Sequence, residues 1–154
     1  MTHPAPPAQN SLTPHLVVDN AREAIDFYKR ALRAQEMYVL TTPDGRGIMH
    51  AQLQIGESHL FLCDAMGENC SSPRKLGGSP ITLHLSVDDA DAWYQTAVAA
   101  GCEVMMPIQD AFWGDRYGQV KDPYGHQWAF ATQQRNLSPE EIQRAAQACC
   151  AGGV

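Results

Sequence analysis

One short motif occurs twice in this chain, and the repetition is the feature that most restricts its fold. His15-Leu16-Val17-Val18-Asp19-Asn20-Ala21 returns as His84-Leu85-Ser86-Val87-Asp88-Asp89-Ala90, which is 84 − 15 = 69 residues later. The period is about half of the 154-residue chain, and it is longer than the ~20 to 50 residues of solenoid repeats. The pattern predicts two copies of one module that face each other across a shared cleft.

The first copy has the pattern of β-α-β-β-β. Residues 12–18 alternate polar with apolar side chains and are rich in β-branched residues, which predicts a strand. The apolar residues from Ala24 to Leu32 have the spacing of a helix. After the turn at Pro43-Asp44-Gly45, strands are predicted over 48–55 and 58–63. This first module spans about residues 11–76.

The second module, about residues 79–134, repeats the plan. The pattern predicts a strand over 81–87, a helix over 91–100 and a strand over 103–106. Two further strands flank the turn Asp122-Pro123-Tyr124-Gly125. The predicted fold class is therefore α+β, with two tandem βαβββ modules in a curved mixed sheet around a cleft.

The two ends of the chain lie outside the modules. Residues 1–10 contain three prolines and are predicted to be a disordered lead-in. Residues 138–154 are predicted to be a C-terminal helix and tail, because Ser138-Pro139-Glu140-Glu141 is a capping box that starts a helix over 139–150. That helix has a weakly apolar side for docking, formed by Ile142, Ala145, Ala146 and Cys149.

Composition excludes several classes of function. A formal charge of −6 without a basic cluster disfavours nucleic acid as a partner. The sequence lacks the run of about 18 apolar residues that a membrane-spanning helix needs. Five cysteines without a zinc or redox spacing indicate reduced thiols, which favours a cytoplasmic location.

Strand alternation places many polar side chains on the side that faces the cleft. Four of the six histidines are predicted there, with His15 and His84 as symmetry mates. A core built only for packing is not usually lined with imidazoles and amides. The residues assigned to the cleft are Thr13, His15, Val17, His50, Gln52, Gln54, His59, Phe61, Cys63, Thr82, His84, Ser86, Gln127, Ala129 and Ala131.

Two motifs and the paired modules resemble a known superfamily. The stretch Asn20 to Tyr28 and the turn Asp122-Pro123-Tyr124-Gly125-His126 resemble the vicinal oxygen chelate superfamily, which includes glyoxalase I, extradiol dioxygenases, and fosfomycin-modifying and bleomycin-sequestering proteins. The motifs that resemble its PhnB-like branch are His50-Ala51-Gln52-Leu53, Gly77-Gly78-Ser79-Pro80 and Phe112-Trp113-Gly114-Asp115-Arg116-Tyr117-Gly118. The likeness covers about residues 11–148, and it implies one superfamily domain over 11–137.

The resemblance also implies where a metal would be bound. The superfamily's ligand positions correspond here to Thr13, Phe61, Thr82 and Ala129, none of which is a usual ligand. We therefore predict no metal cofactor, which disfavours glyoxalase I and ring-cleaving dioxygenase activity. The alternative is a displaced zinc, nickel or iron ion held by His15, His84 and His50, or by His59 in place of His50.

The loop at residues 112–118 allows two interpretations. Trp113, Arg116 and Tyr117 offer aromatic faces and a cation that could grip a planar or anionic molecule. Alternatively, the loop is rigid, the Trp fills the edge of the barrel, and Arg116 pairs with Asp115 or Asp110. Cys63, next to His59 on the same predicted face, is either an activated nucleophile or a small buried side chain.

Two functions remain open. The first is binding of a small organic molecule without a metal, through Thr13, His50, Gln52, His59, Phe61, Thr82, Trp113, Arg116, Tyr117 and Gln127. The second is a lyase, isomerase or dioxygenase-type enzyme in which His15 and His84 act as an acid-base pair or hold the displaced metal. In either case the leftover sheet edges predict a homodimer.

Overall fold

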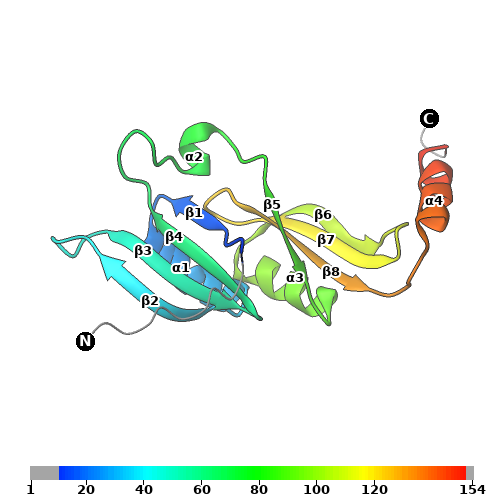
Figure 1. Ribbon diagram of the computed structural model, residues 1–154, viewed down its shortest axis with the longest axis horizontal. Helices are drawn as coiled ribbons and strands as arrows, with labels where there is room; N and C mark the ends of the chain where they lie inside the picture. Colours follow the sequence, from blue (N-terminus) through cyan, green and yellow to red (C-terminus); the bar gives the residue numbers. More distant parts are fainter. Residues whose placement is uncertain (1–10, 152–154) are drawn as a thin grey trace. The chain divides into compact units, whose positions relative to one another are not determined.

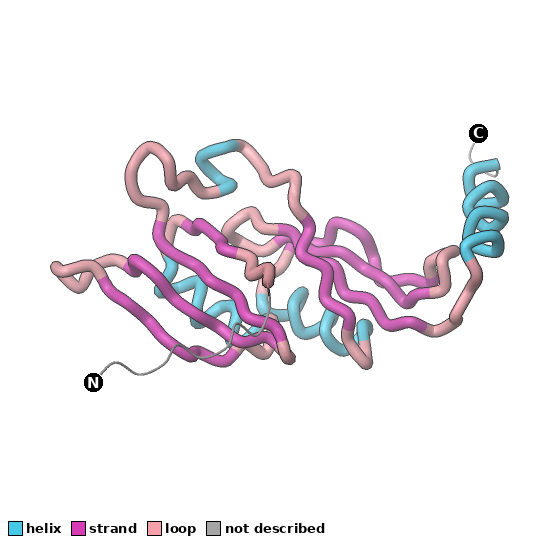
Figure 2. Tube along the Cα trace, viewed as in Figure 1, coloured by secondary structure: helices cyan, strands magenta, loops and turns pink. Residues whose placement is uncertain are grey.

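The computed structural model describes residues 11–151, so the predicted lead-in at residues 1–10 lies outside the described residues. The chain divides into two compact units. One holds the chain up to Lys29 together with Arg33–Ser72, and the other holds Arg30–Leu32 and the chain from Pro73 onward. Figure 1 labels the elements along the chain, and Figure 2 separates helix, strand and loop.

The first unit is built on a four-stranded mixed sheet in the order β1-β4-β3-β2. β1 pairs with β4 in parallel, whereas β3 is antiparallel to both β4 and β2. The elements are β1 (His15–Val18), α1 (Ala21–Ala31), β2 (Gln35–Thr41), β3 (Ile48–Ile55) and β4 (Ser58–Asp64).

The second unit repeats this arrangement in the order β5-β8-β7-β6, again with one parallel pair, β5 with β8. The helix α3 packs against β6, β7 and β8. The elements are β5 (Thr82–Ser86), α3 (Ala90–Ala100), β6 (Glu103–Asp110), β7 (Asp115–Lys121) and β8 (Gln127–Gln133). The predicted α+β class with two βαβββ modules is confirmed.

The same helix-starting contact occurs in both units. At the end of β4, the carboxylate of Asp64 accepts a hydrogen bond from the backbone N–H of Ala21, at 2.7 Å. At the end of β8, the Thr132 hydroxyl accepts from the N–H of Ala90, at 2.8 Å. The first N–H groups of a helix have no partner within the helix. Each unit therefore satisfies one of them from its last strand, which is independent structural evidence for the duplication.

Two strand boundaries and the alternation along one strand differ from the prediction. β1 begins at His15 and not at residue 12, because Pro14 before it has no N–H to donate. β6 runs on to Asp110, past Pro107, which an edge strand tolerates because one of its sides needs no hydrogen bonds. In β3 the alternation was wrong at Met49, which is exposed because the pairing with β2 shifts register between Leu40 and Thr41.

Two helices lie outside the repeated plan. The four-residue α2 (Pro73–Leu76) was not predicted. The predicted C-terminal helix is confirmed as α4 (Pro139–Ala151), with Ser138 and Glu141 exchanging the two hydrogen bonds of a capping box. No residue of α4 is buried, so its apolar side is not docked on the described chain. No helix in the described part is long and apolar enough to cross a membrane.

Candidate functional site

Each sheet has a buried apolar side and a half-exposed side that carries polar and aromatic side chains. In β3, for example, Ala51, Leu53 and Ile55 are buried, whereas His50 and Gln52 between them are half-exposed. We call the half-exposed side the open face. His15, His50, Gln52 and His84 thus lie on the more exposed side of their strands, and the prediction that this side lines a cleft stays a prediction.

The strand pairing within each sheet gives rows of neighbouring residues, and the rows of one unit can be matched to those of the other. In the first unit one row across the sheet is His15, Phe61, Gln52 and Tyr38. The corresponding row in the second unit is His84, Ala129, Gln119 and Met106. A histidine and a glutamine thus recur at matching places in the two rows. The residue between them is Phe61 in the first unit and Ala129 in the second.

In the first unit, the rings of the open face form a compact cluster. The His15 and His50 centroids are 5.7 Å apart, and Phe61 lies 6.1 Å from His15 and 4.8 Å from His50. Burial and the neighbouring His15 lower the pKa of His50, which favours its neutral form. At neutral pH, His50 is consequently a proton acceptor in an aromatic setting.

His59 lies along the same face but outside this ring cluster. Its Nδ1 is 3.0 Å from the amide nitrogen of Gln52. Gln52 therefore links the row that contains His15 and Phe61 to the β3–β4 hairpin. Thr13 precedes β1 and lies outside the sheet. The structure thus brings His15, His50 and Phe61 together, with His59 joined through Gln52.

In the second unit, the rings form a chain. His84 stacks on Tyr117 with centroids 6.0 Å apart, and Tyr117 meets the edge of Trp113 at 5.1 Å. The Tyr117 hydroxyl accepts a hydrogen bond from the Gln119 amide, at 2.6 Å. The Trp113 indole N–H donates to Asp115, at 2.9 Å. Of the three loop residues that sequence analysis grouped, Trp113 and Tyr117 are therefore in contact, and His84 joins them.

Arg116 does not join this aromatic chain. It alternates with Tyr117 along β7, and its guanidinium donates two hydrogen bonds to Asp91 of α3, both at 3.0 Å, and one to Asp110 at 3.3 Å. The hydrogen bonds from Arg116 lower the pKa of Asp91 and raise the pKa of Arg116 itself. These contacts agree with the rigid-loop interpretation, with Asp91 as an additional partner that sequence analysis did not identify.

Two glycines hold the loop at residues 112–118 in place. Gly114 has φ +105°, and a Cβ there would lie 2.6 Å from the carbonyl oxygen of Arg135. A Cβ on Gly118 would lie 3.0 Å from the Tyr94 ring of α3 and 3.1 Å from the backbone of Ile108. Any larger residue would displace backbone at both positions. The glycines therefore fix where Trp113 and Tyr117 are presented.

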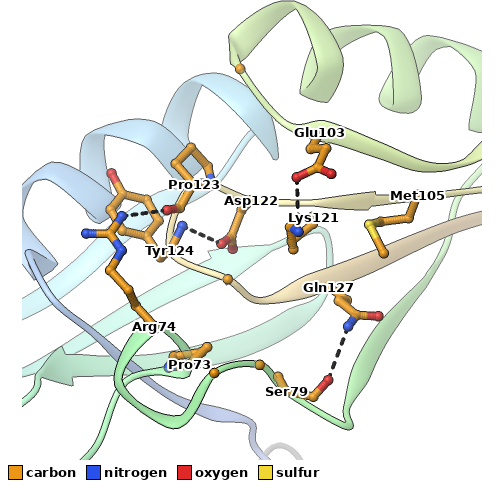
Figure 3. Close-up of a pocket in the computed structure, with 14 residues that line it drawn as sticks. Pro73, Arg74, Ser79, Glu103, Met105, Lys121, Asp122, Pro123, Tyr124 and Gln127 are labelled. Atoms are coloured by element: carbon orange, nitrogen blue, oxygen red, sulfur yellow. Dashed lines mark hydrogen bonds and ion pairs between the residues drawn. The ribbon is translucent and has the colours of Figure 1, made fainter.

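A cavity of about 470 Å³ opens at one end of the second unit (Figure 3). Gln127 lines it and donates to the Ser79 carbonyl at 3.1 Å, and Gln127 also lies 3.4 Å from the hydroxyl of its strand partner Thr82. The cavity also contains the ion pair of Lys121 with Glu103, at 3.0 Å. Gln127 and Thr82 connect it to the open face, because Lys121, Gln127 and Thr82 form the next row of the sheet.

Arg74, Glu103 and Lys121 were missed as cavity residues by sequence analysis. Arg74 donates to the Pro123 carbonyl oxygen at 3.0 Å, so α2 and the turn after β7 meet there (Figure 3). Gly125 of that turn packs against Pro73, since a Cβ on it would lie 2.8 Å from the proline ring. The signal in the sequence was the Gly77-Gly78-Ser79-Pro80 motif, whose first three residues line the cavity.

The residues at the implied metal positions do not fit a metal ion. Phe61 and Ala129 occupy equivalent places in the two rows, and neither has a donor atom. Within residues 11–151, no group of three or more His, Cys, Asp or Glu side chains is arranged to hold a metal. The side chains at the implied positions therefore offer no ligand to a metal ion, whereas the alternative centre of His15, His84 and His50 draws on both units and stays a prediction.

Comparison with known proteins agrees with this architecture. Residues 8–130 match the sequence model of the Glyoxalase/Bleomycin resistance protein/Dioxygenase superfamily. The "Uncharacterized protein Rv0887c" of Mycobacterium tuberculosis is 44% identical over 139 residues, which cover 88% of this chain and 81% of that protein.

Solved structures share the fold. The Arabidopsis thaliana gene product At5g48480 has a TM-score of 0.64 at 28% identity, covering 79% of this chain and 98% of that one. A Bacillus cereus structure described as "Putative 3-demethylubiquinone-9 3-methyltransferase, PhnB protein" has a TM-score of 0.62 at 16% identity, covering 80% and 99%. The chain therefore belongs to the Glyoxalase/Bleomycin resistance protein/Dioxygenase superfamily.

Proposed function

We propose that this protein binds a small organic molecule that carries an aromatic ring, and that it does so without a metal. The observation that carries the proposal is the chain of His84, Tyr117 and Trp113 on the open face of the second unit. Aromatic rings prefer offset or edge contacts with other rings. Beside them, Ala129 and Ala131 add no side chain beyond Cβ, which leaves the ring faces as the main contact surface.

The polar groups beside the rings give such a ligand an orientation. Gln119 and Gln127 supply amide donors, and Lys121 supplies a cation at the cavity end of the same face. A largely apolar surface with a few placed polar groups is typical of small-molecule sites. The ligand class that fits is therefore a planar aromatic molecule with an anionic or hydrogen-bonding substituent.

The test combines a screen with matched variants. We expect members of a panel of aromatic acids and aromatic antibiotics to raise the melting temperature, and 8-anilinonaphthalene-1-sulfonate to bind competitively with them. Tyr117→Ala should weaken binding up to about tenfold, which is the value of one aromatic contact. Gln95→Ala on the exposed side of α3 is the control. Equal affinity in both variants, or no hit in the panel, refutes the proposal.

A second candidate function is general acid-base catalysis by imidazole. It is favoured by His50, whose lowered pKa makes it a neutral base near pH 7, and by its proximity to His15. His15 and His84 occupy equivalent positions in the two units. Unchanged turnover of an identified substrate by the double variant His15→Ala, His84→Ala would exclude the pair as catalytic groups.

We also propose that the protein forms a homodimer through its sheet edges. β2 and β6 are edge strands in equivalent places, and they carry exposed apolar side chains. These are Met37, Tyr38 and Leu40 on β2, and Val104 and Met105 on β6. Exposed edges of this kind are open to pairing. Light scattering should give twice the chain mass of 16.9 kDa, and Leu40→Lys but not Leu76→Lys should reduce it.

A further inference from the structure

Two thiols of the first unit lie next to each other where β4 ends. Cys63 is 6% exposed and belongs to β4, whereas Cys70 is half-buried and belongs to the loop that follows. Their sulfur atoms are 3.7 Å apart. The Cys70 sulfur also lies 3.7 Å from the Asp64 carbonyl oxygen. The chain thus holds two free thiols in direct contact although seven positions separate them in sequence.

Hydrogen bonds fix both ends of this loop. At its start, Asp64 accepts from the N–H groups of Ala21 and Ile48, both at 2.7 Å, and Ala65 donates to the Val18 carbonyl at 2.8 Å. At its end, Ser72 is fully buried and donates to the carboxylate of Asp19. Cys70 is therefore held over Cys63. The sulfurs need to approach by about 1.6 Å more to reach the ~2.05 Å of a disulfide.

We propose that Cys63 and Cys70 form a reversible redox site, in which a peroxide oxidises the dithiol to an intramolecular disulfide. The Cys70 thiolate attacks the peroxide, the O–O bond breaks, and Cys70 becomes a sulfenic acid while hydroxide leaves and takes up the thiol's proton as water. The Cys63 sulfur then attacks the Cys70 sulfur, the S–O bond breaks, and a second water leaves with the Cys63 proton. Two thiols are oxidised, and one peroxide is reduced to two waters or, for an alkyl peroxide, to water and alcohol.

The different surroundings of the two cysteines assign their roles. Cys70 reaches solvent, which gives it access to the oxidant. Burial, followed by the contact with Cys70, raises the pKa of Cys63 to about 11. A buried thiol of this kind is slow with the oxidant, but it lies within reach of a neighbouring sulfenic acid. Cys70 is therefore the reacting thiol and Cys63 the resolving thiol.

The site borders the open face of the first unit. Cys63 pairs with Val17 across β1 and β4, two positions along from the pair of His15 with Phe61. A disulfide would tether the loop to the end of this face and make it rigid. Oxidation is thus expected to raise the melting temperature and to lower proteolysis within the loop.

The experiment uses the full chain with Cys149→Ser and Cys150→Ser, so that the exposed adjacent pair on α4 does not contribute. The protein is treated with hydrogen peroxide, denatured, alkylated and digested with trypsin. Cys63 and Cys70 fall in one tryptic peptide, residues 47–74, which lies between Arg46 and Arg74. We expect this peptide to lose two hydrogens and to resist alkylation until it is reduced. A further cleavage after Glu68 should leave the two halves linked.

Cys102 is the internal control, because it is a buried free thiol and burial raises its pKa to about 12. It should remain a free thiol and be alkylated in full after denaturation. The variant Cys70→Ser should leave Cys63 reduced, and Cys63→Ala should leave a Cys70 sulfenic acid that dimedone traps. Alkylation of both Cys63 and Cys70 after peroxide treatment, or oxidation of Cys70 to sulfinic acid without a link, overturns the proposal.

Discussion

The open faces of the two units share a row of side chains and differ at its centre. His15 and Gln52 in the first unit correspond to His84 and Gln119 in the second, but Phe61 corresponds to Ala129. Phe61 lies between His15 and Gln52 in the first row, and its ring contacts the rings of His15 and His50. The alanine leaves that place to rings from β7 and the loop before it. Duplication thus supplied one scaffold with two different surfaces, and the proposed ligand site uses the one with the small central residue.

The hairpins of the two units provide the largest expected contrast. The β7–β8 turn depends on buried Asp122, whose carboxylate accepts from the N–H groups of Tyr124 and His126 and from the Trp128 indole. Asp122→Ala should lower the free energy of unfolding by ~3 to 5 kcal/mol, because it leaves these buried donors unsatisfied. The matched change in the β3–β4 turn, Gln54→Ala, removes one exposed hydrogen bond and should cost under ~0.5 kcal/mol. Urea unfolding measures both, and equal losses would contradict the contrast.

Exchanging the central residues tests the comparison directly. Ala129 is fully buried, so Ala129→Phe should overpack the second unit and cost about 3 kcal/mol of unfolding free energy. It should also abolish binding of any ligand that contacts Tyr117. Phe61→Ala in the half-exposed first row should cost less. Thermal unfolding of both variants measures the two losses of stability. Tolerance of phenylalanine at position 129 would show that the two faces are interchangeable.

The duplicated helix-starting contact should differ in strength between the units. Asp64 carries a charge and accepts from two backbone N–H groups, whereas the Thr132 hydroxyl is neutral and accepts from one. Asp64→Ala is therefore expected to cost ~2 kcal/mol and Thr132→Ala ~1 kcal/mol. The reverse order in chemical denaturation would indicate that charge does not strengthen this contact.

The histidine pair gives the first unit a pH dependence. Because the pKa of His50 is lowered in the folded protein, the unfolded chain binds more protons as pH falls through the unfolded value of ~6.5. The free energy of unfolding should consequently decrease as pH falls from 7.5 to 5.5. His15→Ala removes one cause of the lowered pKa and should reduce this slope. Melting temperatures across that pH range, with His50→Gln as a second variant, measure the effect.

The smallest expected effect concerns the ion pair between β7 and α3 of the second unit. Arg116 ties β7 to α3 through Asp91, which is 40% exposed. Water and salt screen such a pair, so Asp91→Asn should lower stability slightly and lose its effect in high salt. Ligand binding should be unchanged, since Arg116 lies apart from the aromatic chain. A large loss of ligand affinity in Asp91→Asn would indicate that Arg116 contributes to the binding site.

The sequence by itself determined the architecture. The repeated His-Leu-x-Val-Asp motif, the alternation along the strands and the capping residues Asn20 and Asp89 depend on neighbours a few positions away, so they are visible in one dimension. For the same reason the helix that starts after Ser138 and the half-exposed side of His50 and Gln52 were predicted. The Met49 bulge was not predicted, because a shift in register depends on the partner strand.

Only the tertiary structure decided which side chains meet. Arg116 was grouped with Tyr117 because they are adjacent in sequence, yet adjacent strand residues point to opposite faces and the carboxylates of Asp91 and Asp110 hold the guanidinium. The contact of Cys63 with Cys70 and the cavity beside Lys121 arise where loops fold back on strand ends. Periodic patterns encode the direction of a side chain, but long-range packing alone selects its partner.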